Sequence, residues 1–220
     1  MSTLVPLGDQ AVLLTFEREV DAFHCADRLR RTPPAWMFDI VCSYFTVAVF
    51  FDADAVRFDT VANYLNGLTS GEASAFAGVG TLHSIPCCYE RELDLKRVCE
   101  WTGLSVHEVI ELHTTTVFQV FAIGFCPGFP YLGYLPERLQ GVPRLNSPRL
   151  RVEPGSVGLT AKQTGLYPLA RPGGWNIVGR TPLVLVDLES GYFPLRVGDR
   201  VQFVRIDEQR YRELEGERLV

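Results

Sequence analysis

The segment GFCPGFPYLGYLP, Gly124–Pro136, decides how the second half of this 220-residue chain is interpreted. Three glycines, three prolines and four aromatic residues fall within its thirteen positions. Proline fixes φ and removes a backbone donor, whereas glycine opens φ > 0, so this mixture disfavours a regular helix or a central strand. Loops this long in a compact domain are usually functional or disordered, and the aromatic residues argue against disorder. We therefore predict a long, ordered and irregular loop that takes part in function.

The sequence on either side of this segment predicts a β-barrel. Short apolar runs alternate with glycine-containing turns from residue 83 to residue 206, and this regular spacing is typical of a closed or nearly closed barrel. Gly103 is expected to end one helix, and Ser105 with Glu108 forms a capping-box pattern that begins the next. The predicted strands are 83–89, 116–123, 183–187 and 201–206, the first helix is 94–103, and the charged last fourteen residues form a surface helix or tail.

Residues 1–80 predict a smaller α/β unit. A strand pair or bent strand is expected over 4–16, a helix over 21–31, one or two strands over 39–52 with a turn near Ser43, and a helix over 56–68. This order favours a sandwich with its helices on one face of a sheet. The Gly/Ala/Ser-rich segment 69–80 marks the boundary between a domain of residues 1–80 and one of residues 81–220.

The composition excludes several classes of protein. Hydrophobic residues make up 47% and charged residues 21% of the chain, which is ordinary for a soluble globular protein, and the net charge of −5 disfavours binding to nucleic acid or to acidic membranes. No apolar run approaches the length of a transmembrane helix, and the N-terminus lacks the pattern of a signal peptide. The six cysteines form no CxxC pair and the four histidines show no ligand spacing, so we expect reduced thiols, no metal site and a cytoplasmic location.

Positive charge is concentrated between Leu139 and Val186. This region contains six cations and a single acid, Glu153. Arginine recognises carboxylate and phosphate groups bidentately, so the region predicts a site for a small anion or an acidic partner. The alternative is that these cations pair with acids elsewhere or face water. Arg180, between apolar strand residues and a turn, is predicted to be either a buried ion-pair anchor or a ligand clamp. The six cations are Arg144, Arg149, Arg151, Lys162, Arg171 and Arg180.

Two further side chains are candidates for chemistry. His113 ends a predicted helix, where the helix dipole favours a protonated ring, and it is either a cap or an acid–base or substrate-contacting group. Cys126 lies inside the Gly/Pro loop, but the sequence places no helix N-terminus or base beside it that would activate a thiol. The segment GSVGLTAKQT fails as a phosphate loop because Ala161 and Gln163 flank Lys162.

Several uncommon blocks, taken in order, resemble one known family. They are HSIPCCY, DLKRVCEWTGLSVHEVIELH, GFCPGFPYLGYLP, PRLNSPR, EPGSVGL, QTGLYP, PGGWNIVGRTP and a closing PLRVGDRVQF. Together they cover nearly all of residues 83–203 and resemble the family of the 5-oxoprolinase B subunit, allophanate hydrolase subunit 1 and sporulation-kinase inhibitors.

The resemblance implies an α+β protein in which a small ferredoxin-like α/β sandwich precedes a cyclophilin-like β-barrel. It also implies one subunit of an ATP-dependent hydrolase that opens 5-oxoproline to glutamate, inactive alone. The expected partners are the C subunit of 5-oxoprolinase, whose barrel pairs with this one, and the A subunit. ATP is expected as a co-substrate whose site is shared with a partner, because the chain has no nucleotide loop of its own. The alternatives are a non-enzymatic inhibitor of a sensor histidine kinase, or subunit 1 of an allophanate or urea-amide hydrolase.

Opening a lactam requires fixed cations that hold a carboxylate and phosphates while charge develops, with walls that exclude water. We predict catalytic roles for His113, Arg144 and Arg180. We predict substrate or anion binding by Gly124, Phe125, Gly128, Phe129, Tyr131, Arg149, Gln163, Thr164, Tyr167 and Trp175. The aromatic residues have a second interpretation, as a minor core beneath the loop, and the two interpretations are compatible.

Overall fold

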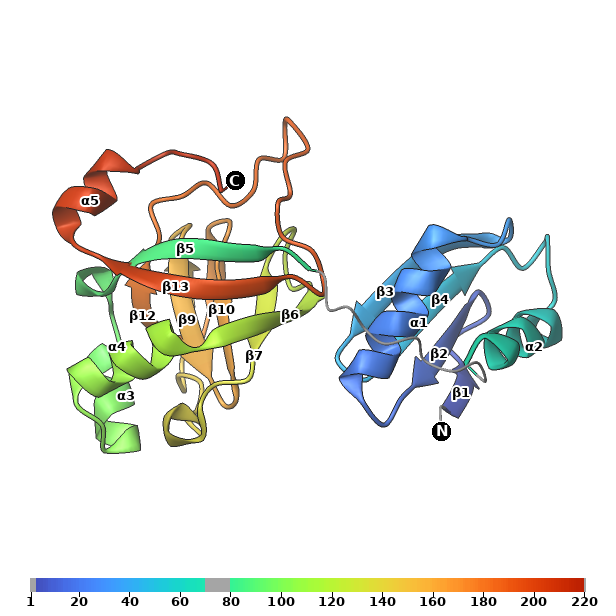
Figure 1. The fold of residues 1–220 in the computed structure, drawn as a ribbon, viewed down its shortest axis with the longest axis horizontal. Coiled ribbons are helices and arrows are strands. Elements are labelled where there is room, and N and C mark those ends of the chain that lie inside the picture. The colour runs from blue at the N-terminus through green and yellow to red at the C-terminus, as the bar shows by residue number, and fades with distance from the viewer. Residues whose placement is uncertain (1–2, 70–79, 220) are drawn as a thin grey trace. The chain divides into compact units, whose positions relative to one another are not determined.

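The computed structural model describes residues 3–69 and 80–219, and the chain divides into two compact units, residues 1–79 and residues 80–220 (Figure 1). The predicted boundary segment, 69–80, lies almost entirely outside the described residues. Within the part of the chain that is described, no helix has both the length and the apolar character needed to cross a membrane.

The N-terminal unit is an antiparallel sheet with strand order β1-β2-β4-β3, packed with helices (Figure 1). Its apolar side chains alternate along each strand, so that Val12, Leu14, Val47 and Val49 are buried together. The expected strand pairs are confirmed, and the turn near Ser43 places Tyr44 at φ 51°. The elements are β1 Thr3–Pro6, β2 Ala11–Thr15, α1 Glu19–Arg31, β3 Met37–Ser43, β4 Thr46–Phe51 and α2 Phe58–Thr69.

The C-terminal unit is a closed barrel with strand order β10-β7-β6-β13-β5-β12-β9, which confirms the predicted α+β class. β13 runs parallel to β5, and the other neighbouring strands are antiparallel. A separate two-stranded ribbon, β8 with β11, lies outside the barrel sheet. The barrel strands are β5 Leu82–Cys88, β6 Val117–Ile123, β7 Pro130–Gly133, β9 Ser156–Thr160, β10 Gln163–Leu166, β12 Asn176–Arg180 and β13 Arg200–Ile206, and the ribbon is β8 Arg149–Val152 with β11 Arg171–Gly173.

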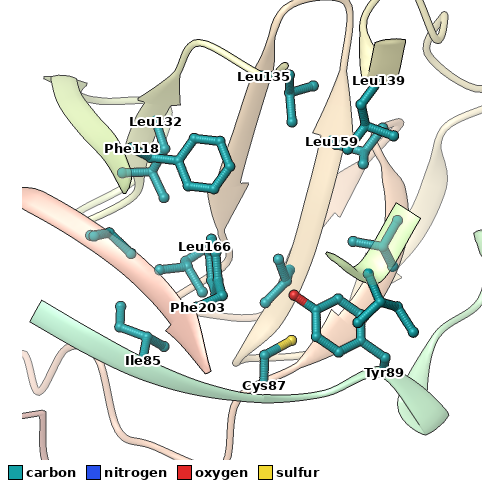
Figure 2. Close-up of a cluster of buried hydrophobic side chains, with 14 of the residues drawn as sticks. Ile85, Cys87, Tyr89, Phe118, Leu132, Leu135, Leu139, Leu159, Leu166 and Phe203 are labelled. Carbon is teal, nitrogen blue, oxygen red and sulfur yellow. The ribbon is translucent and has the colours of Figure 1, made fainter. Parts of the chain in front are cut away.

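The barrel interior is filled by side chains from alternate positions of its strands. Leu132 and Leu159, from strands that are not neighbours in sequence, converge with Phe118, Leu166 and Phe203 in one apolar cluster (Figure 2). Closing the sheet in this way leaves no free edge and encloses the side chains of alternate residues in the interior.

The helices of this unit begin and end as the sequence predicts. Gly103 adopts φ 71° at the end of α3, and Ser105 Oγ accepts from Glu108 N at 3.3 Å while Glu108 Oε2 accepts from Ser105 N at 2.9 Å. The predicted C-terminal helix is present as α5, although its Tyr211 is buried rather than on the surface. The remaining elements are α3 Leu95–Thr102, α4 Val106–Thr115, α5 Glu208–Glu213 and the short 3₁₀ helices η1 Tyr89–Arg91 and η2 Glu137–Leu139.

Two sequence-based expectations about strands were wrong. The segment Gly124–Pro136 is not a loop throughout, because Pro130–Gly133 forms barrel strand β7. Proline is tolerated at the first residue of a strand, where its missing N–H does not interrupt a ladder. Residues 183–187 form no strand: Val184 and Asp187 make isolated bridges to Arg218 and Tyr192, and the barrel strand of that block is β12 instead.

Candidate functional site

A second apolar cluster, separate from the barrel interior, packs beneath the loop that starts at Gly124. We call it the aromatic floor; its buried members are Cys126, Phe129, Val152, Tyr167, Trp175 and Ile177, with Tyr131 packed against it. In β12, Ile177 belongs to the floor while the next residue, Val178, belongs to the interior cluster. Because successive strand residues point to opposite faces, the floor lies on the outer face of the barrel wall.

Two glycines of the barrel wall lie directly under the floor rings. Gly158 of β9 and Gly165 of β10 are direct cross-strand partners. A Cβ at Gly165 would lie 2.9 Å from the carbonyl oxygen of Pro130 and 3.0 Å from atoms of the Phe129 and Trp175 rings. The rings therefore lie directly on the barrel backbone, at a depth that any larger residue would prevent.

The loop above the floor is ordered by its own backbone. Hydrogen bonds run from Cys126 N to Gly124 O at 2.8 Å, from Phe129 N to Cys126 O at 3.1 Å and from Gly124 N to Phe129 O at 3.1 Å. Gly128 has φ 75°, and a Cβ there would lie 2.2 Å from Val186 Cγ2, so this position requires glycine. The N–H groups of Gly124, Cys126 and Phe129 are thus used inside the loop and do not face a ligand.

Two aromatic residues of the loop, Phe129 and Phe125, differ in their exposure to solvent. Phe129 is buried, and its ring lies 5.0 Å from Tyr131, 5.2 Å from Tyr167 and 5.5 Å from Trp175, centroid to centroid. Phe125, held at φ 66°, is 58% exposed and meets the rings of Phe129 and Tyr167 edge-on. The minor-core interpretation is therefore confirmed for the buried rings, and Phe125 forms an exposed rim.

Arg144 is fixed beside the aromatic floor through its neighbours in the chain. Leu145 N donates to Gly174 O at 2.7 Å, and Asn176 Nδ2 donates to Pro143 O at 3.0 Å, so the Arg144 segment is tied on both sides of Trp175. Among the described residues, Arg144 forms no ion pair with a carboxylate. Burial raises the pKa of Tyr167 to about 12, and the positive charge of Arg144 opposes that rise.

Arg171 is a second cation at the floor, and it was not among the residues predicted for the site. It begins β11, opposite Val152 of β8, which is a member of the floor, and its charge acts on the thiol of Cys126. Burial raises the pKa of Cys126, and Arg171 opposes this effect, so the thiol stays protonated at neutral pH and is a poor nucleophile. The only cue in the sequence was the excess of cations over acids in this region.

Arg149, a predicted anion-binding residue, already has an acidic partner. Its Nη2 donates to Asp94 Oδ1 at 2.7 Å, and the other oxygen of Asp94 accepts from Ile177 N at 2.7 Å. The Asp94 side chain is 8% exposed and that of Arg149 is 26% exposed. This ion pair joins the start of α3, β12 and the ribbon, and it neutralises the charge of Arg149.

Asp94→Asn is expected to destabilise the barrel by about 2 kcal/mol, because removing one charge leaves the partly buried guanidinium of Arg149 uncompensated. Urea unfolding at neutral pH measures the loss. Asp207→Asn is the control, since that exposed residue also accepts a backbone N–H but has no ion pair with arginine among the described residues. Equal stability of Asp94→Asn and wild type would contradict the structural role of this pair.

Arg180 lies in different surroundings. Its Nε donates to Pro154 O at 2.9 Å, and its charge acts on Glu153 and Tyr211. None of these three residues belongs to the aromatic floor. Among the described residues, no hydrogen bond or ion pair joins Arg180 to Arg144 or to a side chain of the floor.

His113 is completely buried and neutral. Tyr89 Oη lies 2.7 Å from its Nδ1 and Thr164 Oγ1 lies 2.9 Å from its Nε2, while Phe203 stacks on the ring at 4.5 Å between centroids. Burial lowers the pKa of His113 to about 3, so the expectation of a protonated ring at the helix end was wrong. Desolvation outweighs the helix dipole here.

The predicted site residues thus separate into groups. Those at the floor or its loop are Arg144, Gly124, Phe125, Gly128, Phe129, Tyr131, Tyr167 and Trp175. Thr164 is buried and bonds His113 and Gly158 O, and Gln163 lies opposite Gly133 at the start of β10. Chemically, the exposed ring of Phe125 and the half-buried ring of Tyr131 cover this buried cluster, and beside it lie two guanidinium groups that no carboxylate of the described residues neutralises.

Comparison with known proteins places the chain in a family. The model of the carboxyltransferase domain, subdomain C and D, matches residues 2–193. The 5-oxoprolinase B subunit of Bacillus subtilis (strain 168) is 34% identical over 224 residues, covering 93% of each chain. The 5-oxoprolinase B subunit of Escherichia coli O157:H7 is 51% identical over 112 residues, which is 50% of this chain and 51% of that protein.

A solved structure has the same fold. The crystal structure of TTHA0988 superposes with a TM-score of 0.78 at 33% identity, covering 90% of this chain and 40% of that longer chain. The resemblance drawn from the sequence blocks is confirmed. The chain therefore belongs to the carboxyltransferase-domain family, subdomains C and D, and within it to the family of 5-oxoprolinase B subunits.

Proposed function

We propose that this chain is the B subunit of an ATP-dependent 5-oxoprolinase, a hydrolase complex that opens 5-oxoproline to glutamate. The observation that carries the proposal is the similarity to a 5-oxoprolinase B subunit, at 34% identity over 93% of both chains. The aromatic floor with its arginines supports it, because the substrate is a small flat ring that carries one carboxylate.

In this proposal, Arg144 binds the carboxylate of 5-oxoproline and the floor rings hold the lactam ring. A planar guanidinium suits a carboxylate because two parallel N–H groups meet two oxygens. Phe125 and the half-buried Tyr131 supply apolar surface against the ring and limit the access of water, and the buried Tyr167 and Trp175 support them from below. Excluding water strengthens the charge interaction and orients the amide for attack.

The amide of a lactam is a poor electrophile, and ATP supplies the activation. Transfer of the terminal phosphoryl group to the lactam oxygen releases ADP. One water then adds to the ring carbon and the C–N bond breaks to give the amine and an acyl phosphate, from which a second water releases phosphate and leaves the new carboxylate. The charge that develops on oxygen and phosphate requires fixed cations. We place this chain's contribution in binding and orientation, and we assign the nucleotide to a site shared with a partner subunit.

The partners in this proposal are the A and C subunits of 5-oxoprolinase, with the barrel of the C subunit paired to this barrel, and the complex is placed in the cytoplasm. Co-expression of the three chains followed by an assay of ATP-dependent glutamate release tests the assignment. Glutamate formed only when 5-oxoproline, ATP and all three subunits are present would support it. Hydrolysis of allophanate instead of 5-oxoproline, or binding to a sensor histidine kinase without turnover, would replace it with one of the alternatives.

A further inference from the structure

Two arginines approach the aromatic floor from different segments of the chain. The Arg144 segment is bonded to Gly174 and Asn176, on either side of Trp175. Arg171 opens β11, which leads through Gly173 into the same tryptophan. Among the described residues, neither arginine forms an ion pair with a carboxylate, whereas Arg149 and Arg151 of the facing strand β8 are both paired, with Asp94 and Glu153.

The strand that carries Arg171 lies directly against the floor. A Cβ at Gly173 would lie 2.5 Å from Tyr167 Oη and 2.9 Å from two atoms of its ring, so the backbone of β11 lies against that side chain. Arg171 pairs across the ribbon with Val152, a buried member of the floor, and its charge acts on Cys126, while Arg144 acts electrostatically on Tyr131 and Tyr167. The two charges therefore lie beside one surface, which Phe125 and Tyr131 form over the buried floor rings.

One cation is sufficient for a monocarboxylate, so a second unneutralised cation beside the same surface fits a ligand with two anionic groups. We propose that Arg144 and Arg171 form a two-point receptor for a small dicarboxylate, in which Arg171 binds the second carboxylate. The identity of this second group rests on the proposed function: it is the carboxylate that opening of the lactam creates. Hydrolysis adds water across the ring C–N bond, and the ring carbonyl carbon becomes that carboxylate while the nitrogen becomes the amine.

The receptor predicts a preference that is measurable on the full chain alone. Glutarate and pentanoate have the same five-carbon chain and differ in one carboxylate, so they serve as matched probes. Calorimetric titration of wild type is expected to give glutarate an affinity about tenfold higher than that of pentanoate, which corresponds to one additional charge-assisted hydrogen-bonded contact.

Arg171→Gln is expected to remove most of this tenfold preference and to leave pentanoate affinity within about twofold, whereas Arg171→Lys, which keeps the charge, retains most of the preference. Arg151→Gln is the control, because Arg151 lies on the partner strand of the ribbon and is already paired with Glu153 at 2.6 Å. Equal wild-type affinities for the two probes, or equal losses of both in Arg171→Gln, would overturn the receptor.

The result is independent of the turnover assay. If the reconstituted complex releases no glutamate from 5-oxoproline, the proposed function is excluded. The dicarboxylate site and its dependence on Arg171 are not affected by that result. If the complex hydrolyses 5-oxoproline normally but the chain shows no preference for glutarate, the contact of Arg171 with a second carboxylate is excluded. The proposed function then stands.

Discussion

Arg144→Gln is expected to lower kcat/KM for 5-oxoproline in the reconstituted complex by about 100-fold. Loss of a charge-assisted hydrogen bond to a carboxylate costs about 1.5–3 kcal/mol, and each 1.4 kcal/mol is a factor of ten. Arg144 forms no ion pair among the described residues, so its removal orphans no carboxylate there and leaves the fold intact. Steady-state kinetics with 5-oxoproline varied at saturating ATP measures the change.

The effect is expected mainly in KM for 5-oxoproline, because the proposed contact is made to a carboxylate that is present in both substrate and transition state. Arg138→Gln is the control, since it removes an arginine whose charge is paired with Glu108 at 2.9 Å on another part of the barrel unit. Arg144→Gln turnover within threefold of wild type, with an unchanged melting temperature, would exclude Arg144 from the site.

The correct sequence-based predictions are those that depend on local chemistry. The capping box at Ser105 and Glu108 and the glycine at the end of α3 are set by a few neighbouring residues, and both are present. The barrel was also predictable, because short apolar runs separated by regularly spaced glycine-containing turns are visible along the chain. The strand β7 was missed because a proline is acceptable at a strand's first position, and the sequence does not show which position that is.

The composition of the site depended on pairings that the sequence does not reveal. Arg149 is neutralised by Asp94, a residue 55 positions away in the sequence. The sequence alone therefore indicated that the charge of Arg149 was free to bind an anion. The glycine wall under the floor requires the register that sets Gly158 against Gly165, and this register is a property of the closed sheet. The local excess of positive charge is visible in the sequence, but three-dimensional pairing decides which arginines remain unneutralised.

The stability of the barrel is expected to fall as the pH is lowered from 7 to 5, by about 2 kcal/mol for His113 alone. The folded state holds the pKa of His113 at about 3, whereas an exposed histidine in the unfolded chain has a pKa of about 6.5. The folded pKa is the lower of the two, so the unfolded state binds the extra proton first. The stabilisation is therefore complete above pH 6.5 and is lost progressively as the pH falls towards 3.

His113→Gln is expected to remove this pH dependence. It is also expected to lower the free energy of unfolding at pH 7 by about 2–3 kcal/mol, because Tyr89 Oη loses its hydrogen-bond partner and Phe203 loses the ring stacked on it. Urea unfolding at pH 7 and pH 5 in a Trp36→Phe background measures both effects, since the two remaining tryptophans, Trp101 and Trp175, lie in the barrel unit. His107→Gln controls for an exposed histidine, whose side chain is 80% accessible. If wild type and His113→Gln lose the same stability between the two pH values, His113 is not a neutral core residue, and its catalytic assignment would again require a test in the complex.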